Sequence, residues 1–559
     1  MQYRDSPLPA TFQHILRKRS AGNPICSNRF HQIPSDSIQN HPILPDFTQS
    51  APMQPTVPGP LLCLFLPLIL IMTTVTSCGA PEAEVNGDRS AVAVHAQNRF
   101  PMLEPCSVPF VEEELLCGRM EVHENREDAD SRMISLHVTV VPSLSEHPEP
   151  DPLFDFSGGP GTASGGMAGA YAYFIKGYRE TRDIILVDQR GTGGSHPLHC
   201  DLRTDHPNAN GLLNDMYPPE QVQTCREELE QIADLTRYTT DHFVQDLDDV
   251  REWLGFDRIN LAGLSYGTRA AMQYMRRYPE NVRAAVLMGV VAPGRYVPTY
   301  HAPGGQRALE LLFDDCLEDA ACSGAFPDIH DDFTVLLERL KTDPPSVSIE
   351  LEGERYEVVV RRDQFAEFIR SRLGSSAGNR GLPFIIHQAR HGNFIPFLES
   401  ALPGELQMFE DPFLAEGLYL AVTCAEDLPF VDADAAARVN RDTWFGNYRV
   451  EQQMRACGMW PRASILGDFH ETLESGIPVL LISGRLDQVT PPDWAEQASA
   501  RMTNTRHIVL EHGAHVPAGL SNFECLDGIM SEFIQTADPQ SPDEACIADM
   551  LPPAFETGN

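Results

Sequence analysis

The sequence predicts an α/β fold in which a largely parallel sheet is covered by helices on both faces. Short apolar segments of strand length alternate with segments of helical periodicity, and several of them run directly into glycine-rich turns. The 559 residues are 42% hydrophobic and 22% charged, which is ordinary for a globular protein. Strands that alternate with helices imply parallel pairing, because each crossover places a helix on one face of the sheet.

Seven segments are expected to form this sheet and three to form helices that pack on it. The helix over residues 241–254 is the clearest, because its apolar residues recur at intervals of four, three and four. The expected strands are 134–141, 153–156, 183–188, 258–263, 284–291, 478–483 and 507–510, and the expected helices are 241–254, 268–278 and 493–501.

Residues 295–470 interrupt the alternation. They contain a hairpin over 347–360, which turns near Gly353, and a helix over 363–373 with one apolar face. We interpret this segment as an inserted, mainly helical cap over the carboxyl edge of the sheet, where open α/β sheets bind ligands. The sheet domain is then divided into residues 106–294 and 471–559, and a linker over 78–105 precedes it.

The leader, residues 1–77, is expected to lie outside the fold. Residues 1–60 lack periodicity, and the apolar run Leu61–Met72 is too short to span a bilayer but suits a signal peptide. The small residues that follow resemble a bacterial lipoprotein signal, in which Cys78 is lipidated. Unlike most export signals, this one has no Lys or Arg between Met53 and Cys78. We expect export to the cell envelope or beyond, with an ordinary cleaved signal as the alternative to lipidation.

Cysteine usage also indicates an oxidising compartment. Of the 13 cysteines, Cys26, Cys63 and Cys78 precede the fold, which leaves an even ten, as disulfides require. No Cys-x-x-Cys motif supports a zinc ribbon or a thioredoxin-type site. As a hypothesis, neighbouring cysteines pair as Cys106–Cys117, Cys200–Cys225, Cys316–Cys322, Cys424–Cys457 and Cys525–Cys546.

The formal charge is −37, from 42 basic and 79 acidic residues. This balance argues against a nucleic-acid partner and against docking on anionic lipid, both of which need a basic surface. A membrane would be reached only through a lipid on Cys78. A partner with a positive group, such as a peptide amine, would be attracted. The sequence gives no indication of the oligomeric state.

A serine nucleophile is predicted within residues 263–267, which read Gly-Leu-Ser-Tyr-Gly. This G-x-S-x-G motif lies between an expected strand and an expected helix, where a sharp turn presents the hydroxyl of Ser265 above the sheet. Glycines flank the serine because side chains would clash across so tight a turn. A serine hydroxyl needs a base to remove its proton, so a histidine and an acid must lie elsewhere.

The acid and the base are expected in that order, after the last two strands. Asp487 follows the strand at 478–483, and two histidines, His512 and His515, follow the strand at 507–510. We favour His515, because Gly513 allows the turn that brings it back over the sheet. Asp487 would hold the imidazole in the correct tautomer.

An oxyanion site is expected from Ser157-Gly158-Gly159-Pro160-Gly161 at the end of an early strand. The N–H groups of Gly158 or Gly159, together with that of Tyr266, would stabilise the negative charge that acyl transfer places on a carbonyl oxygen. A second glycine-rich segment, residues 188–195, is interpreted as bracing this loop.

Together, GGPG, DQRGTGGS, GLSYG, GRLDQVTP and GAH, in that order, resemble the proline iminopeptidase and tripeptidyl aminopeptidase family (peptidase family S33) of α/β-hydrolases. The resemblance covers residues 106–546, and the large cap and paired cysteines look more like the secreted tripeptidyl branch. It implies a triad of Ser265, Asp487 and His515, and neither a metal nor a cofactor. Iminopeptidases usually have His where this chain has Ser157, which argues against strict specificity for proline.

The expected activity is hydrolysis of peptides near their free N-terminus through an acyl-enzyme. Such a substrate carries a protonated amine, and Glu426, in a segment that resembles a family segment bordering the active site, is the expected anchor for it. A carboxylesterase with the same triad is the alternative. A hydrolase-fold protein that binds without catalysis is a third interpretation, which the presence of all three triad residues disfavours.

Overall fold

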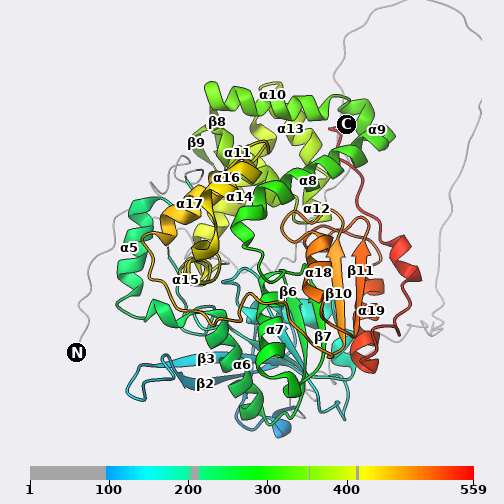
Figure 1. Cartoon of the computed structure of the whole chain (residues 1–559). Helices are drawn as coiled ribbons and strands as arrows, with labels where there is room; N and C mark the ends of the chain where they lie inside the picture. The colour runs from blue at the N-terminus through cyan, green and yellow to red at the C-terminus, as the bar shows by residue number, and fades with distance from the viewer. Residues whose placement is uncertain are drawn as a thin grey trace, which may run out of the picture. The chain divides into compact units, whose positions relative to one another are not determined.

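The computed structural model describes residues 96–200, 202, 213, 215–351, 353–410 and 414–558, so the leader and Cys78 lie outside the described residues. A nine-stranded sheet runs through this part of the chain in the order β1-β2-β3-β5-β4-β6-β7-β10-β11. Figure 1 labels its strands β2, β3, β6, β7, β10 and β11. Its strands are β1 (Glu104–Cys106), β2 (Leu115–His123), β3 (Met133–Val141), β4 (Leu153–Phe156), β5 (Ile184–Val187), β6 (Ile259–Leu264), β7 (Val282–Met288), β10 (Val479–Gly484) and β11 (Thr505–Leu510).

The sheet is mostly parallel, as the sequence predicts. The neighbouring pairs from β5 across to β11 are all parallel. The pairs β1–β2, β2–β3 and β3–β5 are antiparallel. The parallel strands β4, β5 and β10 are buried along their whole length. Strands become buried in this way when helices cover both faces of a parallel sheet.

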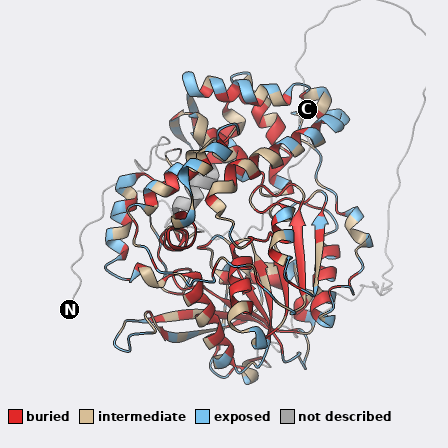
Figure 2. Ribbon diagram, in the orientation of Figure 1, coloured by how far each residue is buried: buried red, intermediate tan, exposed pale blue. Residues whose placement is uncertain are grey.

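Alternate residues of each strand contribute to two separate hydrophobic clusters, one on each face of the sheet. In β10, Val479 and Leu481 belong to the cluster that also contains residues of helices α6 (Thr240–Leu254), α7 (Tyr266–Arg277) and α18 (Pro492–Ser499). Leu480 and Ile482 belong to the cluster on the opposite face, which also contains residues of α19 (Phe523–Thr536) and α3 (Ala168–Tyr173). Figure 2 shows buried residues concentrated along the strands and the inward sides of these helices.

The fold begins earlier in the chain than the sequence analysis places it. Residues 78–105 were expected to be a linker, but Ala96, Phe100 and Leu103 are almost fully buried in the hydrophobic core. The antiparallel strands β1 and β2 also extend the sheet beyond the expected strands. The sequence gives little sign of them, because β1 has only three residues and β2 is only partly buried.

The segment between β7 and β10 forms a largely helical insertion with its own hydrophobic core (Figure 1). Its hairpin, β8 (Ser346–Leu351) and β9 (Glu354–Val359), turns at Gly353, which has a φ of +82°. The helices are α8 (Val297–Glu318), α9 (Ala320–Ala325), α10 (Ile329–Thr342), α11 (Arg362–Arg372), α12 (Ser376–Asn379), α13 (Leu382–Arg390), α14 (Ile395–Glu410), α15 (Glu416–Glu426), α16 (Ala433–Asn440) and α17 (Tyr448–Cys457). We call this insertion the cap.

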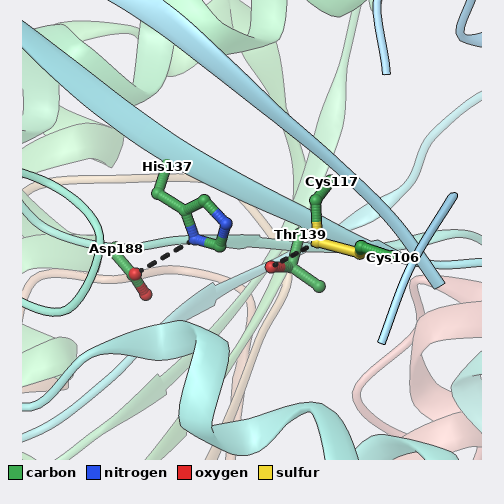
Figure 3. Close-up of a disulfide and its surroundings, with 5 residues drawn as sticks. All are labelled: Cys106, Cys117, His137, Thr139 and Asp188. Carbon is green, nitrogen blue, oxygen red and sulfur yellow. Dashed lines mark hydrogen bonds and ion pairs between the residues drawn. A yellow bond between two sulfur atoms is a disulfide. The ribbon is translucent and has the colours of Figure 1, made fainter. Parts of the chain in front are cut away.

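All five predicted disulfides are present: Cys106–Cys117, Cys200–Cys225, Cys316–Cys322, Cys424–Cys457 and Cys525–Cys546. The first joins β1 to β2, and its Cys117 sulfur lies 3.8 Å from the hydroxyl of Thr139 (Figure 3). Five disulfides are typical of a protein that folds in an extracellular or cell-envelope compartment. Within the described residues, no helix combines the length and the apolar character needed to cross a bilayer.

Candidate active site

Ser265 lies in a strained turn between β6 and α7. Its φ of 56° and ψ of −123° fall in a region that few residues other than glycine adopt, and its N–H donates to the carbonyl of Met288 at 2.9 Å. The flanking glycines have no room for a side chain. A Cβ on Gly267 would lie 1.7 Å from the carbonyl oxygen of Phe156, and one on Gly263 would lie 2.9 Å from that of Gly267. The motif therefore fixes the serine at the end of its strand.

Asp487 and His515 follow β10 and β11 and meet at the same edge of the sheet. The Nδ1 atom of His515 lies 2.8 Å from Oδ2 of Asp487. His512, the competing candidate, has no hydrogen-bond partner for Nδ1 among the described residues. The structure therefore pairs the predicted acid with His515.

The Asp487 carboxylate is fully buried and yet surrounded by donors. Its Oδ1 accepts from the N–H groups of Val489 and Thr490, both at 2.8 Å, and its Oδ2 from the Thr490 hydroxyl at 2.7 Å. Burial alone would raise the pKa of Asp487, but the charge of His515 and these hydrogen bonds lower it below the ordinary value. Burial lowers the pKa of His515, because it disfavours the charged imidazole. The Asp487 carboxylate favours the charged imidazole, and the net effect raises the pKa of His515.

Ser265 and His515 line one cavity of about 320 Å³. Its walls come from both parts of the fold. The sheet side contributes the loop after β4 and the start of α7, and the cap contributes α8, α11, α15 and α17. The residues from the cap that line it include His301, Arg370, Tyr419, Asp427 and Arg449.

The glycine-rich loop after β4 lies against the serine. A Cβ on Gly158 would lie 3.3 Å from Cβ of Ser265, so the loop backbone runs beside the nucleophile. Gly159 has a φ of +108°, and a Cβ there would lie 2.8 Å from the nitrogen of Gly161. Tyr266 begins α7, and helix N-termini direct free N–H groups outward. This geometry suits an oxyanion site built from the loop and the first turn of α7.

Ser157 turns away from the cavity and supports the loop from beneath. Its hydroxyl donates to Asp155 at 2.7 Å and accepts from the hydroxyl of Ser164 at 3.1 Å. The other oxygen of Asp155 accepts from Tyr171 at 2.7 Å. Burial raises the pKa of Asp155 despite these three hydroxyl-bearing neighbours.

Residues 188–195 brace the same region, as the sequence analysis expects. The Asp188 carboxylate accepts from the N–H groups of Gly165 and Gly194, both at 2.8 Å, and lies 3.2 Å from Nδ1 of His137 (Figure 3). Arg190 is fully buried and donates to both oxygens of Asp246, at 2.6 and 2.7 Å. Neither residue lines the cavity.

Glu426, the expected anchor for a substrate amine, does not line the cavity. It is fully buried, and its two oxygens accept from the N–H and the hydroxyl of Thr240, at 2.7 and 2.8 Å. The last turn of α15 directs Glu426 toward the start of α6 and places the next residue, Asp427, at the cavity wall. Arg269 holds the Asp427 carboxylate with hydrogen bonds of 3.0 and 2.8 Å. Of the two adjacent acids, Asp427 is therefore the one that lines the cavity.

The cavity also contains the cap residues Arg370, Tyr419 and Arg449, which the sequence does not indicate. They come from three helices far apart in the chain, so no local motif could have indicated that they share one cavity.

Comparisons with known proteins agree with this architecture. Residues 152–312 match the family model of the α/β hydrolase fold, and residues 441–546 match a model described as TAP-like protein. The tripeptidyl aminopeptidase of Streptomyces coelicolor is 24% identical over 389 residues, which cover 66% of this chain and 71% of that protein. The proline iminopeptidase of Aeromonas sobria is 28% identical over 160 residues, 28% of this chain and 33% of that protein.

Serine protease Hip1 of Mycobacterium tuberculosis is 28% identical over 228 residues, which are 38% of this chain. The match spans only 44% of the length of that relative. Among solved structures, the proline iminopeptidase of Mycobacterium smegmatis covers 75% of this chain and 98% of its own, with 15% identity and a TM-score of 0.37, too low to add to the argument. On the fold, the motifs and the two family models, the chain is an α/β-hydrolase enzyme, and it is similar to the proline iminopeptidases and the tripeptidyl aminopeptidases.

Proposed function

We propose that the protein is a serine exopeptidase that hydrolyses peptides near their free N-terminus. The observation that carries this proposal is the 2.8 Å hydrogen bond between His515 and a buried, ionised Asp487, at the rim of the cavity that Ser265 also lines. A serine, an imidazole and a carboxylate in this order are the parts needed for acyl transfer. The relatives named as serine protease, tripeptidyl aminopeptidase and proline iminopeptidase support a peptide substrate.

In the proposed mechanism, Nδ1 of His515 stays bonded to Asp487, which leaves Nε2 as the base for the hydroxyl of Ser265. Ser265 attacks the scissile carbonyl, and the N–H groups of Gly158 or Gly159 and of Tyr266 stabilise the oxyanion. His515 then passes its proton to the leaving amine, and water hydrolyses the acyl-enzyme in a second, equivalent step.

Asp427 replaces Glu426 in this proposal as the residue that binds the substrate's ammonium group. Two carboxylates, Glu426 and Asp427, lie beside the single guanidinium of Arg269, at 3.6 and 2.8 Å. When both carboxylates are ionised the group carries one net negative charge, and Asp427 presents it to the cavity. A protonated peptide amine complements that charge.

The test compares chromogenic peptides of one to three residues with a free or an acetylated N-terminus. We expect acetylation to lower kcat/KM by about 100-fold or more, because it removes the charge that Asp427 would bind. The Ser265→Ala variant is the control for catalysis by this site. Equal turnover of free and acetylated peptides would contradict the exopeptidase assignment, and hydrolysis of simple esters without any peptide would favour the carboxylesterase.

We also propose that the protein is exported and that Cys78 carries the lipid. The five disulfides support an oxidising compartment, and Cys78 lies outside the described residues. Mass spectrometry of the mature protein should find a modified Cys78 at the N-terminus. An unmodified N-terminus at another residue would contradict lipidation.

A further inference from the structure

The cap side of the cavity carries two guanidinium groups that share one carboxylate oxygen. Nε of Arg370 lies 2.9 Å from Oε2 of Glu367, and Nη1 of Arg449 lies 3.4 Å from the same atom. Both arginines line the cavity, and the side chain of Arg370 is only 7% exposed. One carboxylate therefore serves two permanently charged groups.

This part of the wall has a net positive charge. Its histidine, His301, does not offset the excess, because burial and the charges of Arg449 and Arg370 hold the pKa of the imidazole well below its ordinary value and keep it neutral. The two arginines lower the pKa of Glu367, which stays ionised. An uncompensated charge in a poorly solvated wall is costly unless an anion occupies the site. The positive sign also contrasts with the formal charge of −37 of the whole chain.

Several hydrogen-bond donors at this wall have no acceptor among the described residues. The hydroxyl of Tyr419 accepts from Gln453 at 2.6 Å and from Arg449 at 3.3 Å, and within the described part of the chain its own proton has no recorded acceptor. Nε of Arg449 is buried without a partner there. Nη2 of Arg370 likewise has no hydrogen bond to any described residue, because the contacts of this guanidinium use Nε and Nη1. The hydroxyl of Tyr419 and Nη2 of Arg370, together with the positive charge of Arg449, fit a carboxylate.

The basic wall lies on the side of His515. The segment after α11 is hydrogen-bonded to the loop that carries His515. The N–H of Val516 donates to the carbonyl of Gly374 at 2.9 Å, and Ser375 forms an isolated β-bridge with Val516. Arg370 is also near enough for its charge to oppose the rise in the pKa of His515. Asp427, in contrast, is held by Arg269 of α7, the helix that begins directly after Ser265. The cavity thus has an acidic wall at Asp427, next to α7, and a basic wall at Arg370 and Arg449, next to the imidazole of His515.

We propose that Arg370, Arg449 and Tyr419 form a carboxylate-binding subsite for the leaving part of the substrate. This inference rests on the proposed function, in which His515 gives its proton to the leaving amine and so faces that part of the peptide. A short peptide would place its ammonium at Asp427 and its carboxylate at the arginine pair. A volume of about 320 Å³ lies at the small end for ligand pockets, which suits a short substrate.

The test measures binding to the Ser265→Ala protein by calorimetry, so it does not depend on turnover. The first pair of ligands is a tripeptide of neutral side chains as the free acid and as its C-terminal amide. The second pair consists of two tripeptides that both end in a C-terminal amide. One has Glu as its last residue and the other has Gln. We expect the ligand with the carboxylate to bind about 10- to 100-fold more tightly in one pair, which identifies the source of the carboxylate. Equal binding within both pairs, or no binding at millimolar concentration, would overturn the proposal.

Three variants of the Ser265→Ala protein and a fourth, matched control variant separate the subsite from general damage. Arg370→Gln and Arg449→Gln should each remove most of the preference for the carboxylate while the amide binds within about threefold of its original affinity. Glu367→Gln removes the competing internal carboxylate and should increase the preference, an effect that misfolding cannot produce. Arg390→Gln, on α13 and away from the cavity, is the matched control and should change neither affinity. A preference that survives both cavity variants would also overturn the proposal.

The two tests fail separately. If acetylated and free peptides are hydrolysed equally while acid and amide still bind differently, the exopeptidase assignment fails and the carboxylate subsite stands. If acetylation abolishes turnover but acid and amide bind equally, the carboxylate subsite fails and the exopeptidase assignment stands.

Discussion

Asp487 on the sheet side and Glu426 on the cap side are both fully buried carboxylates, yet their pKa values move in opposite directions. Burial raises the pKa of each, because a poorly solvated site disfavours the charged form. For Glu426 burial prevails, and its pKa rises to about 7. For Asp487 the charge and hydrogen bonds of its neighbours prevail, and its pKa falls.

The difference lies in the number of donors and in where the nearest cation directs its hydrogen bonds. Asp487 accepts from two backbone N–H groups, one hydroxyl and the imidazole of His515. Among the residues that the structure describes, the Glu426 carboxylate accepts only from Thr240. Arg269, 3.6 Å away, directs its hydrogen bonds to Asp427 instead. The sheet side is thus organised to hold a permanent negative charge beside His515, whereas the cap side holds a group that titrates near neutral pH.

The largest effect is expected from Asp487→Asn. An asparagine cannot accept from all the donors that surround Asp487, and it favours the wrong tautomer of His515. We expect kcat to fall by about 10³- to 10⁴-fold. Steady-state kinetics on a peptide with a free N-terminal amine measures this loss of kcat. The control is Asp493→Asn, which changes an exposed acid in the first turn of α18 and should leave kcat unchanged. Activity retained in Asp487→Asn would contradict the proposed triad.

Glu426→Gln should change how stability depends on pH. The pKa of Glu426 is about 7 in the folded protein against 4.5 for the free side chain, so the folded state binds the extra proton between these values. Its contribution is favourable below pH 4.5 and is lost as the pH rises toward 7. Glutamine does not titrate. The free energy of unfolding of the variant should therefore exceed that of the wild type increasingly across this window, by up to about 3 kcal/mol.

Urea unfolding at several pH values from 5 to 8 measures this difference. Glu524→Gln, an exposed acid in the first turn of α19, is the control and should give a constant offset. Parallel curves for wild type and Glu426→Gln would show that Glu426 keeps an ordinary pKa.

Much of the fold and the pairing of His515 with Asp487 could be predicted because the constraints on them are local. Strand β5 and the first four residues of β10 are continuous apolar runs, and the glycines of the serine turn leave no space for a Cβ. Gly513 is equally confined, since a Cβ there would lie 2.7 Å from Cβ of Leu510. These contacts arise within a few residues of the motif or across adjacent strands, so the sequence pattern records them.

The cap wall could not be predicted, because its contacts arise between distant helices. Glu426 and Asp427 are adjacent at the end of α15, and only the packing of that helix decides which of them reaches the cavity. Arg370 and Arg449 are 79 positions apart, and Glu367 brings them together. A charged residue on an amphipathic helix usually lies on its solvated face, so neither arginine could be distinguished from a surface residue.

The smallest effects are expected from removing one hydroxyl donor from each carboxylate. Thr490→Val and Thr240→Val are of similar shape to the wild type, and both threonines are fully buried. The first removes a 2.7 Å hydrogen bond to Asp487 and should lower kcat by about tenfold, because the carboxylate that orients His515 is less well held. The second removes a 2.8 Å hydrogen bond to Glu426 and should leave kcat within about threefold.

Thr240→Val should instead raise the pKa of Glu426 further, because one of the groups that lower it is lost. The loss of stability, which still begins near pH 4.5, then extends to higher pH and becomes larger, the opposite of its complete removal in Glu426→Gln. Measuring kcat and the free energy of unfolding in urea for Thr490→Val and Thr240→Val distinguishes the role of the Asp487 network from that of the Glu426 network. An equal loss of kcat in both would mean that the Glu426 network acts on the reaction as directly as the Asp487 network does.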